Sequence, residues 1–241
     1  MEKNNPLISV IIPVYNEERY LSEALDSVQQ QSYSPIEIIV IDDDSVDNSA
    51  TIAKSYQTVK YFFQSKSGLS VALNKGLKIA FGDFFSFLDA DDIWEEHKLS
   101  LQMEALRTDP TLDAVFGHHR QFISSDVSRT IEDQRILPAP FKGAMLIRRE
   151  SFFRVGLFDT SLTLGDFIDW YKRAMEAELK FLMLPDIVMR RRIHDNNSSV
   201  RDRHAEKDYV RIMKAALDRK RKKQAEEQKS NNPETGQQQK P

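Results

Sequence analysis

Three aspartates directly follow an apolar segment in the stretch "FFSFLDADDIW", residues 84–94. Asp89, Asp91 and Asp92 repel one another, and closely packed like charges are costly unless a cation or strong hydrogen-bond donors lie nearby. In an extended chain, a spacing of two turns Asp89 and Asp91 toward the same side. Carboxylate oxygens suit Mg²⁺ or Mn²⁺, especially where substrate phosphates complete the coordination. The pattern favours a divalent-cation site, and the alternative is that Asp92 merely caps the next helix.

A second acidic group lies in "DDDS", residues 42–45, again at the end of an apolar segment. Asp44 and Ser45 are best explained by a turn with helix capping. Asp42 or Asp43 could instead accept a hydrogen bond from a base N–H, which uracil and guanine both offer. The pattern therefore indicates either a turn or a contact with a nucleotide base.

Apolar strands that alternate with amphipathic helices are predicted to position these acids. Asn16, and Asp47 or Asn48, are plausible helix caps. Ligands of an open parallel sheet bind beyond the carboxyl ends of its strands. The predicted strands cover residues 7–15, 36–45, 59–64 and 84–89, and the predicted helices cover residues 16–31, 46–57 and 69–82. We therefore expect a parallel, doubly wound sheet with the ligand site at its acidic edge.

The pattern changes after about residue 95. The last eleven positions, 231–241, are polar and are expected to be disordered. The elements predicted before them are a helix over 97–109, a strand over 112–117, a polar loop over 124–140, a short strand and helices over 143–156 and 167–179, a strand over 181–194 that Pro185 interrupts, and a helix over 205–229.

Composition excludes several classes of function. The chain has 241 residues, a net charge of −3 and no cysteine. Disulfides, cysteine-based zinc sites and thiol catalysis are thereby excluded, and no strong field indicates a nucleic-acid partner. No apolar segment reaches the roughly 18–20 residues that span a bilayer, and the polar first residues are not typical of a signal peptide. We therefore expect a cytoplasmic protein.

The segments "SVIIPVYNEERYLSEALDSVQQQSY", "EIIVIDDDSVDNSATIA" and "SGLSVALNKGLKIAFGDFFSFLDADD" together resemble the family 2 glycosyltransferases of the GT-A fold. Weaker similarity in "GAMLIRRESFFRVGLFD" and "RRRIHDNNSS" extends the resemblance to about 200 of the 241 residues. It implies a Rossmann-like, mostly parallel sheet flanked by helices, with a smaller acceptor-side region and a C-terminal helix. The implied divisions are a transferase domain over 1–212, with a nucleotide-binding half over 7–118 and an acceptor or catalytic half over 119–212, and a charged helix with a disordered tail over 213–241.

The resemblance also implies roles for individual residues. Asp43 faces the base, and Asp89 contacts the ribose or the metal. Asp91 is the principal ligand of Mn²⁺ or Mg²⁺, and His194 closes over the diphosphate and reaches the metal, for which imidazole is a suitable ligand. The residues implied to line the nucleotide pocket or to shape the loop and helix beside it are Pro13, Tyr15, Glu17, Gly68 and Asn74.

The general base of the implied inverting transfer is where the sequence departs from the family. The family usually supplies it from a Glu-Asp pair at the start of a helix, and here the matching stretch is "GDFIDWYKRA". Asp166 takes the place of the glutamate, and Phe167 takes the place of the aspartate. Asp169 lies three positions after Asp166, so both can lie near one helix face. The open alternatives are that Asp166 or Asp169 is the base, that the protein binds a donor without efficient transfer, or that this is a solvated helix start.

A second departure concerns the diphosphate. Leu73 stands where many relatives carry an arginine, so this charge would be met by Lys66, Lys75 or the run 190–192, unless these are solvated surface residues. Arg192 is favoured because its run directly precedes His194.

The implied function is a hexosyltransferase-type enzyme that uses a nucleoside diphosphate sugar, with a UDP-sugar favoured. The acceptor is a hydroxyl of a glycan, a lipid-linked sugar or another molecule. The alternatives are a non-catalytic relative that binds nucleotide sugars and a phospho-receiver signalling module. The basic stretch "DRKRKKQAEEQK" could contact anionic lipid or a partner, or be solvated, so a position at the inner face of the membrane stays open. The identity of the sugar and the oligomeric state stay open as well.

Overall fold

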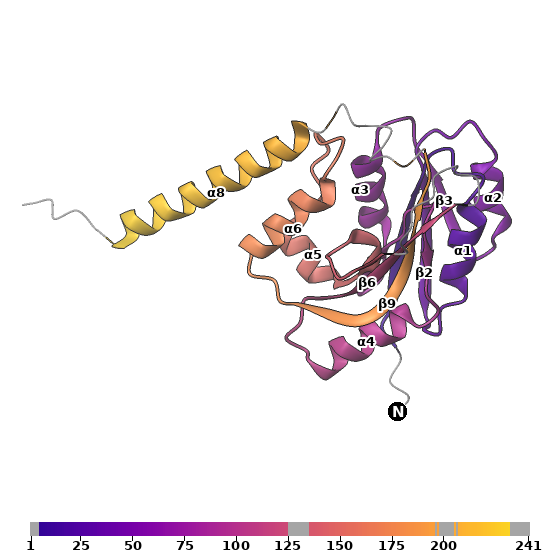
Figure 1. Ribbon diagram of the computed structural model, residues 1–241, viewed down its shortest axis with the longest axis horizontal. Coiled ribbons are helices and arrows are strands. Elements are labelled where there is room, and N and C mark those ends of the chain that lie inside the picture. The colour runs from indigo at the N-terminus through magenta and orange to yellow at the C-terminus, as the bar shows by residue number, and fades with distance from the viewer. Residues whose placement is uncertain (1–4, 125–134, 196, 198–204, 206, 232–241) are drawn as a thin grey trace, which may run out of the picture.

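One mixed sheet forms the centre of the computed structural model, and helices cover both of its faces (Figure 1). The structure describes residues 5–124, 135–195, 197, 205 and 207–231. The strands lie in the order β3-β2-β1-β4-β8-β6-β9-β5, and the short β7 (Ile136–Leu137) pairs with β6. The expected α/β class, with a central sheet flanked by helices, is confirmed.

The first half of the sheet is parallel, as the sequence predicts. Its strands are β1 (Ile8–Val14), β2 (Ile36–Asp42), β3 (Val59–Phe63) and β4 (Phe84–Phe87). All seven positions of β1 are buried, because this central strand is covered on both faces. Since β2 and β4 both run parallel to β1, the acids that follow them reach the same edge of the sheet.

The second half of the sheet is not purely parallel. β8 (Met145–Arg148) runs antiparallel to β4 and to β6 (Ala114–Ile123), whereas β9 (Phe181–Ile193) runs parallel to β6 and antiparallel to β5 (Ile93–Trp94). The predicted interruption at Pro185 is wrong, because β9 passes through this residue with an irregular register against β6. Since β8 is antiparallel to β4, it begins near the carboxyl end of β4. The 3-10 helix η1 (Lys142–Ala144), which precedes β8, therefore reaches the acidic edge.

Helices cover the two faces of the sheet in two groups (Figure 1). One buried cluster lies under α1 (Leu21–Gln29), α2 (Ser49–Ser55) and α4 (Lys98–Thr108), and the other lies under α3 (Leu69–Ile79), α5 (Arg149–Val155) and α6 (Asp166–Glu176). α3 approaches β1 so closely that a Cβ atom on Gly76 would lie 2.5 Å from Ile11 Cγ2.

The last described element, α8 (Lys207–Asn231), begins against the start of α6 and then projects away from the sheet (Figure 1). Ile212 of α8 is buried, and its Cδ1 would lie 2.7 Å from a Cβ on Gly165. Asp208 accepts hydrogen bonds from the backbone N–H groups of Thr163 and Leu164. The expected boundary after residue 212 therefore falls inside one continuous helix, whose first turns hold the loop that leads into α6.

The predicted cap at Asn16 is wrong. α1 begins at Leu21, and Asn16 lies in the left-handed region with φ 55°. Its Oδ1 accepts a hydrogen bond from Val46 N at 2.8 Å. Apolar spacing predicts the helix, but the turn before it is fixed by the loop that follows β2.

Candidate active site

The three aspartates after β4 lie in different environments. Asp89 and Asp91 are partly exposed, whereas Asp92 is buried and accepts a hydrogen bond from Arg192 N at 2.8 Å. Burial, together with the charges of Asp91 and Asp89, raises the pKa of Asp92 well above its ordinary value. Asp92 is followed by β5, and α4 begins only at Lys98. The alternative that Asp92 caps the next helix is therefore wrong.

Asp91 forms a close pair with His194 from the end of β9. His194 Nε2 lies 2.9 Å from Asp91 Oδ2, which also accepts a hydrogen bond from Asn197 Nδ2 at 3.0 Å. Asn197 in turn fixes the histidine, because His194 N donates to Asn197 Oδ1 at 2.7 Å. The fold thus brings together two of the predicted metal-ligating residues from segments 103 positions apart.

Arg192 holds the acidic segment in place. Its Nε donates to the carbonyl oxygen of Asp91 at 2.9 Å, and its Nη2 donates to Glu23 of α1 at 2.8 Å. The guanidinium also lies over the ring of Tyr20, 4.5 Å from its centroid. Arg192 therefore has a positioning role, and its contact with a diphosphate stays a prediction.

Lys142 of η1 is a buried cation at the same edge. Its Nζ lies 3.0 Å from Asp89 Oδ1 and 4.0 Å from Asp166 Oδ2. Burial favours the neutral amine, but the charges of Asp89 and Asp166 outweigh it and raise the pKa of Lys142. An ammonium group therefore joins an acid that follows β4 to an acid at the start of α6.

The two candidate bases have different partners. Asp166 opens α6 and faces Lys142. Asp169 is buried and bonded to Arg173 Nε at 2.8 Å, with Arg219 of α8 at 3.8 Å. Its carboxylate therefore belongs to a structural ion-pair cluster between α6 and α8.

Phe167, at the position of the usual base, belongs to the core. It is 9% exposed and packs against Phe116, Trp170 and Tyr171 at centroid distances of 6.3, 6.2 and 6.0 Å. A carboxylate at this position would be placed in an aromatic cluster, where an unpaired charge is costly. Phe167 therefore contributes to the core and supplies no acid to the site.

Asp43 organises the loop that precedes α3. It accepts hydrogen bonds from Gln64 Nε2 and from the backbone N–H groups of Ser67 and Gly68 at 2.8–2.9 Å. Lys66 Nζ lies 3.7 Å from Asp43 Oδ2 and also lies over the ring of Tyr15. The predicted group of Tyr15, Asp43 and Gly68 is thus assembled in one place, and its contact with a base stays a prediction.

Asn74 links α3 to the segment that follows α5. Its Nδ2 donates to the Phe158 carbonyl at 2.9 Å, and Phe158 N donates to its Oδ1 at 3.0 Å. Pro13 is buried in β1, and Glu17 lies just beyond the end of that strand. Nucleotide contacts of these three residues stay predictions.

The donor atoms at Asp91 and His194 fit a divalent cation, because one carboxylate and one imidazole suit Mn²⁺ and leave positions for phosphate oxygens. Asp89 Oδ1 is buried and accepts no hydrogen bond within the described part of the chain. Among the described residues, no three His, Cys, Asp or Glu side chains converge as a metal site. A cation here would therefore need ligands from a substrate.

Two residues of the site were missed by sequence reasoning. Asn197 lies in the "RRRIHDNNSS" stretch, so its nearness to His194 in sequence was an available signal. Lys142 lies in "PFKGAML", where nothing distinguishes it from a surface lysine. Lys142 lies close to the acids only because β8, which follows it, runs antiparallel to β4.

Comparison with known proteins gives a consistent result. The sequence model described as "Glycosyl transferase family 2" matches residues 9–159. An "uncharacterized glycosyltransferase" of Rickettsia typhi is 33% identical over 209 residues, which cover 79% of this chain and 65% of the relative. Glycosyltransferase GlyG of Streptococcus pneumoniae is 34% identical over 125 residues, 50% of this chain and 41% of the relative. The chain thus spans less than two thirds of the lengths of these curated relatives.

Solved structures share the fold. TarS of S. aureus in complex with UDP-GlcNAc matches 87% of this chain and 65% of its own chain, with a TM-score of 0.69 and 19% identity. The mannosyltransferase PcManGT from Pyrobaculum calidifontis, in complex with GDP-Man and Mn²⁺, matches 81% of this chain and 59% of its own, with a TM-score of 0.64 and 21% identity. At such identities the match shows the GT-A fold alone.

Proposed function

Since the chain belongs to glycosyl transferase family 2, we propose that it moves a sugar from a nucleoside diphosphate sugar to an acceptor hydroxyl, with inversion at the anomeric carbon. The observation that carries this proposal is the edge of the sheet where Asp91 pairs with His194 while Lys142 joins Asp89 to Asp166. A hexose from a UDP-sugar is the favoured donor group. Structural relatives are described with UDP-GlcNAc and with GDP-Man, so GDP-sugars are the second choice.

Asp91 and His194 would hold Mn²⁺ or Mg²⁺, and a solved relative is described with Mn²⁺. A divalent cation, when bound, offsets the negative charge of a leaving nucleoside diphosphate. Hydrogen bonds from Asn197 and Arg192 hold Asp91 and His194 in position. Asp166 would remove the proton from the acceptor hydroxyl, because its carboxylate lies 4.0 Å from Lys142, which also contacts Asp89, whereas that of Asp169 is held by arginines.

We expect UDP to raise the melting temperature of the full chain only when Mn²⁺ or Mg²⁺ is present. A ligand at 100 times its Kd stabilises the folded state by about 2.7 kcal/mol, which corresponds to roughly 5–10 °C for a chain of this size. A thermal-shift screen of UDP-, GDP-, CDP- and dTDP-sugars with Mn²⁺, repeated with EDTA, measures this and identifies the donor. UDP and GDP binding that is unaffected by the chelator would contradict the metal assignment.

A non-catalytic relative that only binds nucleotide sugars is the second candidate, and it rests on Phe167 in the usual position of the base. Donor hydrolysis by the wild-type chain, measured with the donor from the screen, separates the two candidates. The phospho-receiver alternative is wrong, because the chain belongs to a transferase family and continues from β4 into an antiparallel second half.

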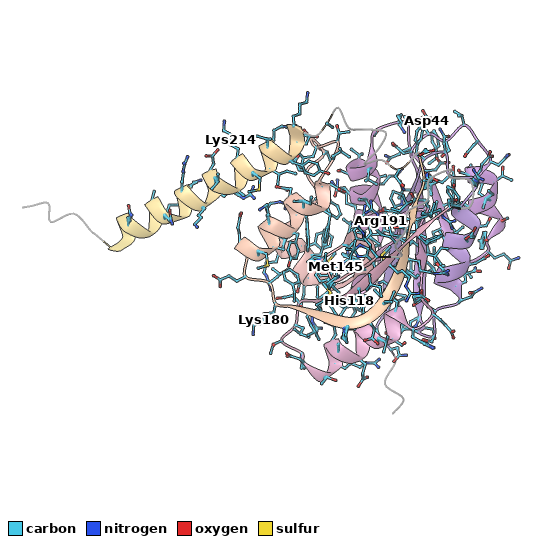
Figure 2. The ribbon with its side chains drawn as sticks, viewed as in Figure 1. Asp44, His118, Met145, Lys180, Arg191 and Lys214 are labelled. Carbon is cyan, nitrogen blue, oxygen red and sulfur yellow. The ribbon has the colours of Figure 1, made fainter. Side chains whose placement is uncertain are left out.

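We further propose that α8 binds anionic membrane surfaces and thereby brings the site to a lipid-linked acceptor. Val210, Met213 and Leu217 are 70%, 50% and 52% exposed and lie on one side of the helix. Exposed basic side chains accompany them, and Figure 2 shows one of these, Lys214, on the projecting part of α8. None of the described helices is long and apolar enough to cross a bilayer. An apolar stripe with basic neighbours is typical of a helix that lies in the membrane interface.

The full chain is therefore expected to sediment with phosphatidylserine-containing vesicles and not with pure phosphatidylcholine vesicles. Lys220→Glu/Arg221→Glu should reduce the bound fraction several-fold, because each basic residue contributes about 1 kcal/mol at an anionic surface. Lys78→Glu/Lys180→Glu makes the same change in net charge at exposed positions elsewhere and should leave binding nearly unchanged. Equal binding by both double variants would rule out α8 as the contact.

A further inference from the structure

Two buried lysines lie near the carboxyl end of β4, and their surroundings differ. Lys98 has three neutral acceptors within hydrogen-bond distance, at Ser86 Oγ (2.8 Å), Gln102 Oε1 (3.0 Å) and the Met145 carbonyl (3.3 Å). These acceptors satisfy the donors of the buried amine, whose pKa burial lowers well below its ordinary value. Lys98 is therefore explained as part of the core.

Lys142 is not explained in this way. In the described part of the chain its ammonium has only the ion pairs with Asp89 and Asp166, of which the second, at 4.0 Å, is too long for a hydrogen bond. The facing oxygens, Asp89 Oδ1 and Asp166 Oδ2, are buried and accept no hydrogen bond of good geometry. Buried polar groups in native proteins are normally paired. Among the described residues, the ammonium therefore has a single close partner, Asp89 at 3.0 Å, and can donate further hydrogen bonds to a ligand beside it.

The backbone behind Lys142 is held unusually firmly. Trp94 Nε1 donates to the Gly143 carbonyl at 2.9 Å, and Gln102 Nε2 donates to the Ala144 carbonyl at 2.8 Å. The Met145 carbonyl accepts hydrogen bonds from Ser86 Oγ and Lys98 Nζ. Three successive carbonyls are thus fixed by side chains of β4, β5 and α4. This rigid attachment sets the position of the Lys142 side chain.

We propose that Lys142 donates a hydrogen bond to the sugar of the donor and so contributes to recognition of the sugar rather than of the nucleotide. The inference rests on the proposed function. If the diphosphate lies at Asp91 and His194 and the base is Asp166, the reacting carbon lies between these groups, and Lys142 borders that position. The partners of Lys142 are Asp89 and Asp166, whereas those of Asp91 are His194 and Asn197. The two sets share no side chain, so removal of the ammonium should weaken binding of the sugar more than binding of the diphosphate.

The test compares UDP with UDP-GlcNAc, and GDP with GDP-mannose, by calorimetry on the full chain with Mn²⁺. Lys142→Met removes the ammonium and keeps the apolar stem. We expect the Kd of the nucleoside diphosphate to change by less than about twofold and the Kd of the nucleotide sugar to rise by about tenfold or more, because a good hydrogen bond to a charged group is lost. Lys78→Met removes an exposed lysine and should alter neither Kd.

A second variant guards against misfolding of Lys142→Met. Trp94→Phe removes the hydrogen bond to the Gly143 carbonyl while keeping an aromatic ring in the core and the Lys142 ammonium in the chain. It should weaken nucleotide-sugar binding a few-fold, leave nucleoside diphosphate binding unchanged, and raise KM more than it lowers kcat. Equal weakening of nucleotide and nucleotide sugar in either variant, or no weakening in both, would overturn the inference. If the wild-type chain binds neither UDP nor GDP, the proposed function itself fails, which is a different result.

Discussion

Replacement of Asp91 by asparagine is expected to reduce sugar transfer by about 10²–10⁴-fold, equivalent to about 3–5 kcal/mol of transition-state stabilisation. The amide keeps the size of the side chain but removes the charge that a cation at this position requires. His194 and Asn197 would remain in place, because the amide of the new asparagine still offers each of them a hydrogen-bonding atom. The loss should therefore appear in transfer and in metal-dependent nucleotide binding, not in the fold.

The melting temperature provides the internal check for this substitution. Asp91 and Asp89 both add to the unfavourable environment of the buried Asp92. Removing one of these charges should leave the melting temperature of the metal-free chain unchanged or slightly raised. Asp186→Asn alters an exposed acid on β9 and serves as the matched control, with full activity expected. Transfer that survives Asp91→Asn, measured as release of nucleoside diphosphate, would show that no cation is bound through this residue.

Asp166→Asn is expected to lower kcat by about 10²–10⁴-fold, which is the usual contribution of a general base. The carboxylate lies on the first turn of α6, where its contribution to stability through the helix dipole is only about 0.3–1 kcal/mol. The variant should therefore fold, because Lys142 keeps its closer ion pair with Asp89 at 3.0 Å. Rapid-quench or steady-state assays with saturating donor and acceptor would separate the chemical step from binding.

Asp169→Asn is the matched substitution three positions along the same helix, and the opposite result is expected. It leaves Arg173 and Arg219 without their buried carboxylate, so the free energy of unfolding should fall by about 3 kcal/mol, or roughly 6–12 °C in melting temperature. Below that temperature kcat should remain close to wild type. Loss of kcat in Asp169→Asn, with normal kcat in Asp166→Asn, would reverse the assignment of the base.

The acidic edge could be predicted in considerable detail because its residues follow directly on strands. Buried apolar runs, rich in β-branched residues before Asp43 and in phenylalanine before Asp89, identify the strands, and the alternation with helices predicts that the strands are parallel. Parallel strands put their following residues at one edge, so Asp43 and Asp91 could be placed there without coordinates. His194 could be assigned to the site only through the family resemblance, because a single histidine in a sequence does not indicate where it lies in the fold.

The sequence by itself determined the family, the parallel nucleotide half and the gathering of acids at one edge, because periodicity and strand direction are local properties of the chain. Tertiary structure alone decided that Lys142 lies among these acids, since this depends on β8 running antiparallel beside β4. It also gave Asp166 and Asp169 different partners. Both positions suit one face of an isolated helix, but packing of α6 against the aromatic core and α8 turns one carboxylate toward Lys142 and gives the other to two arginines.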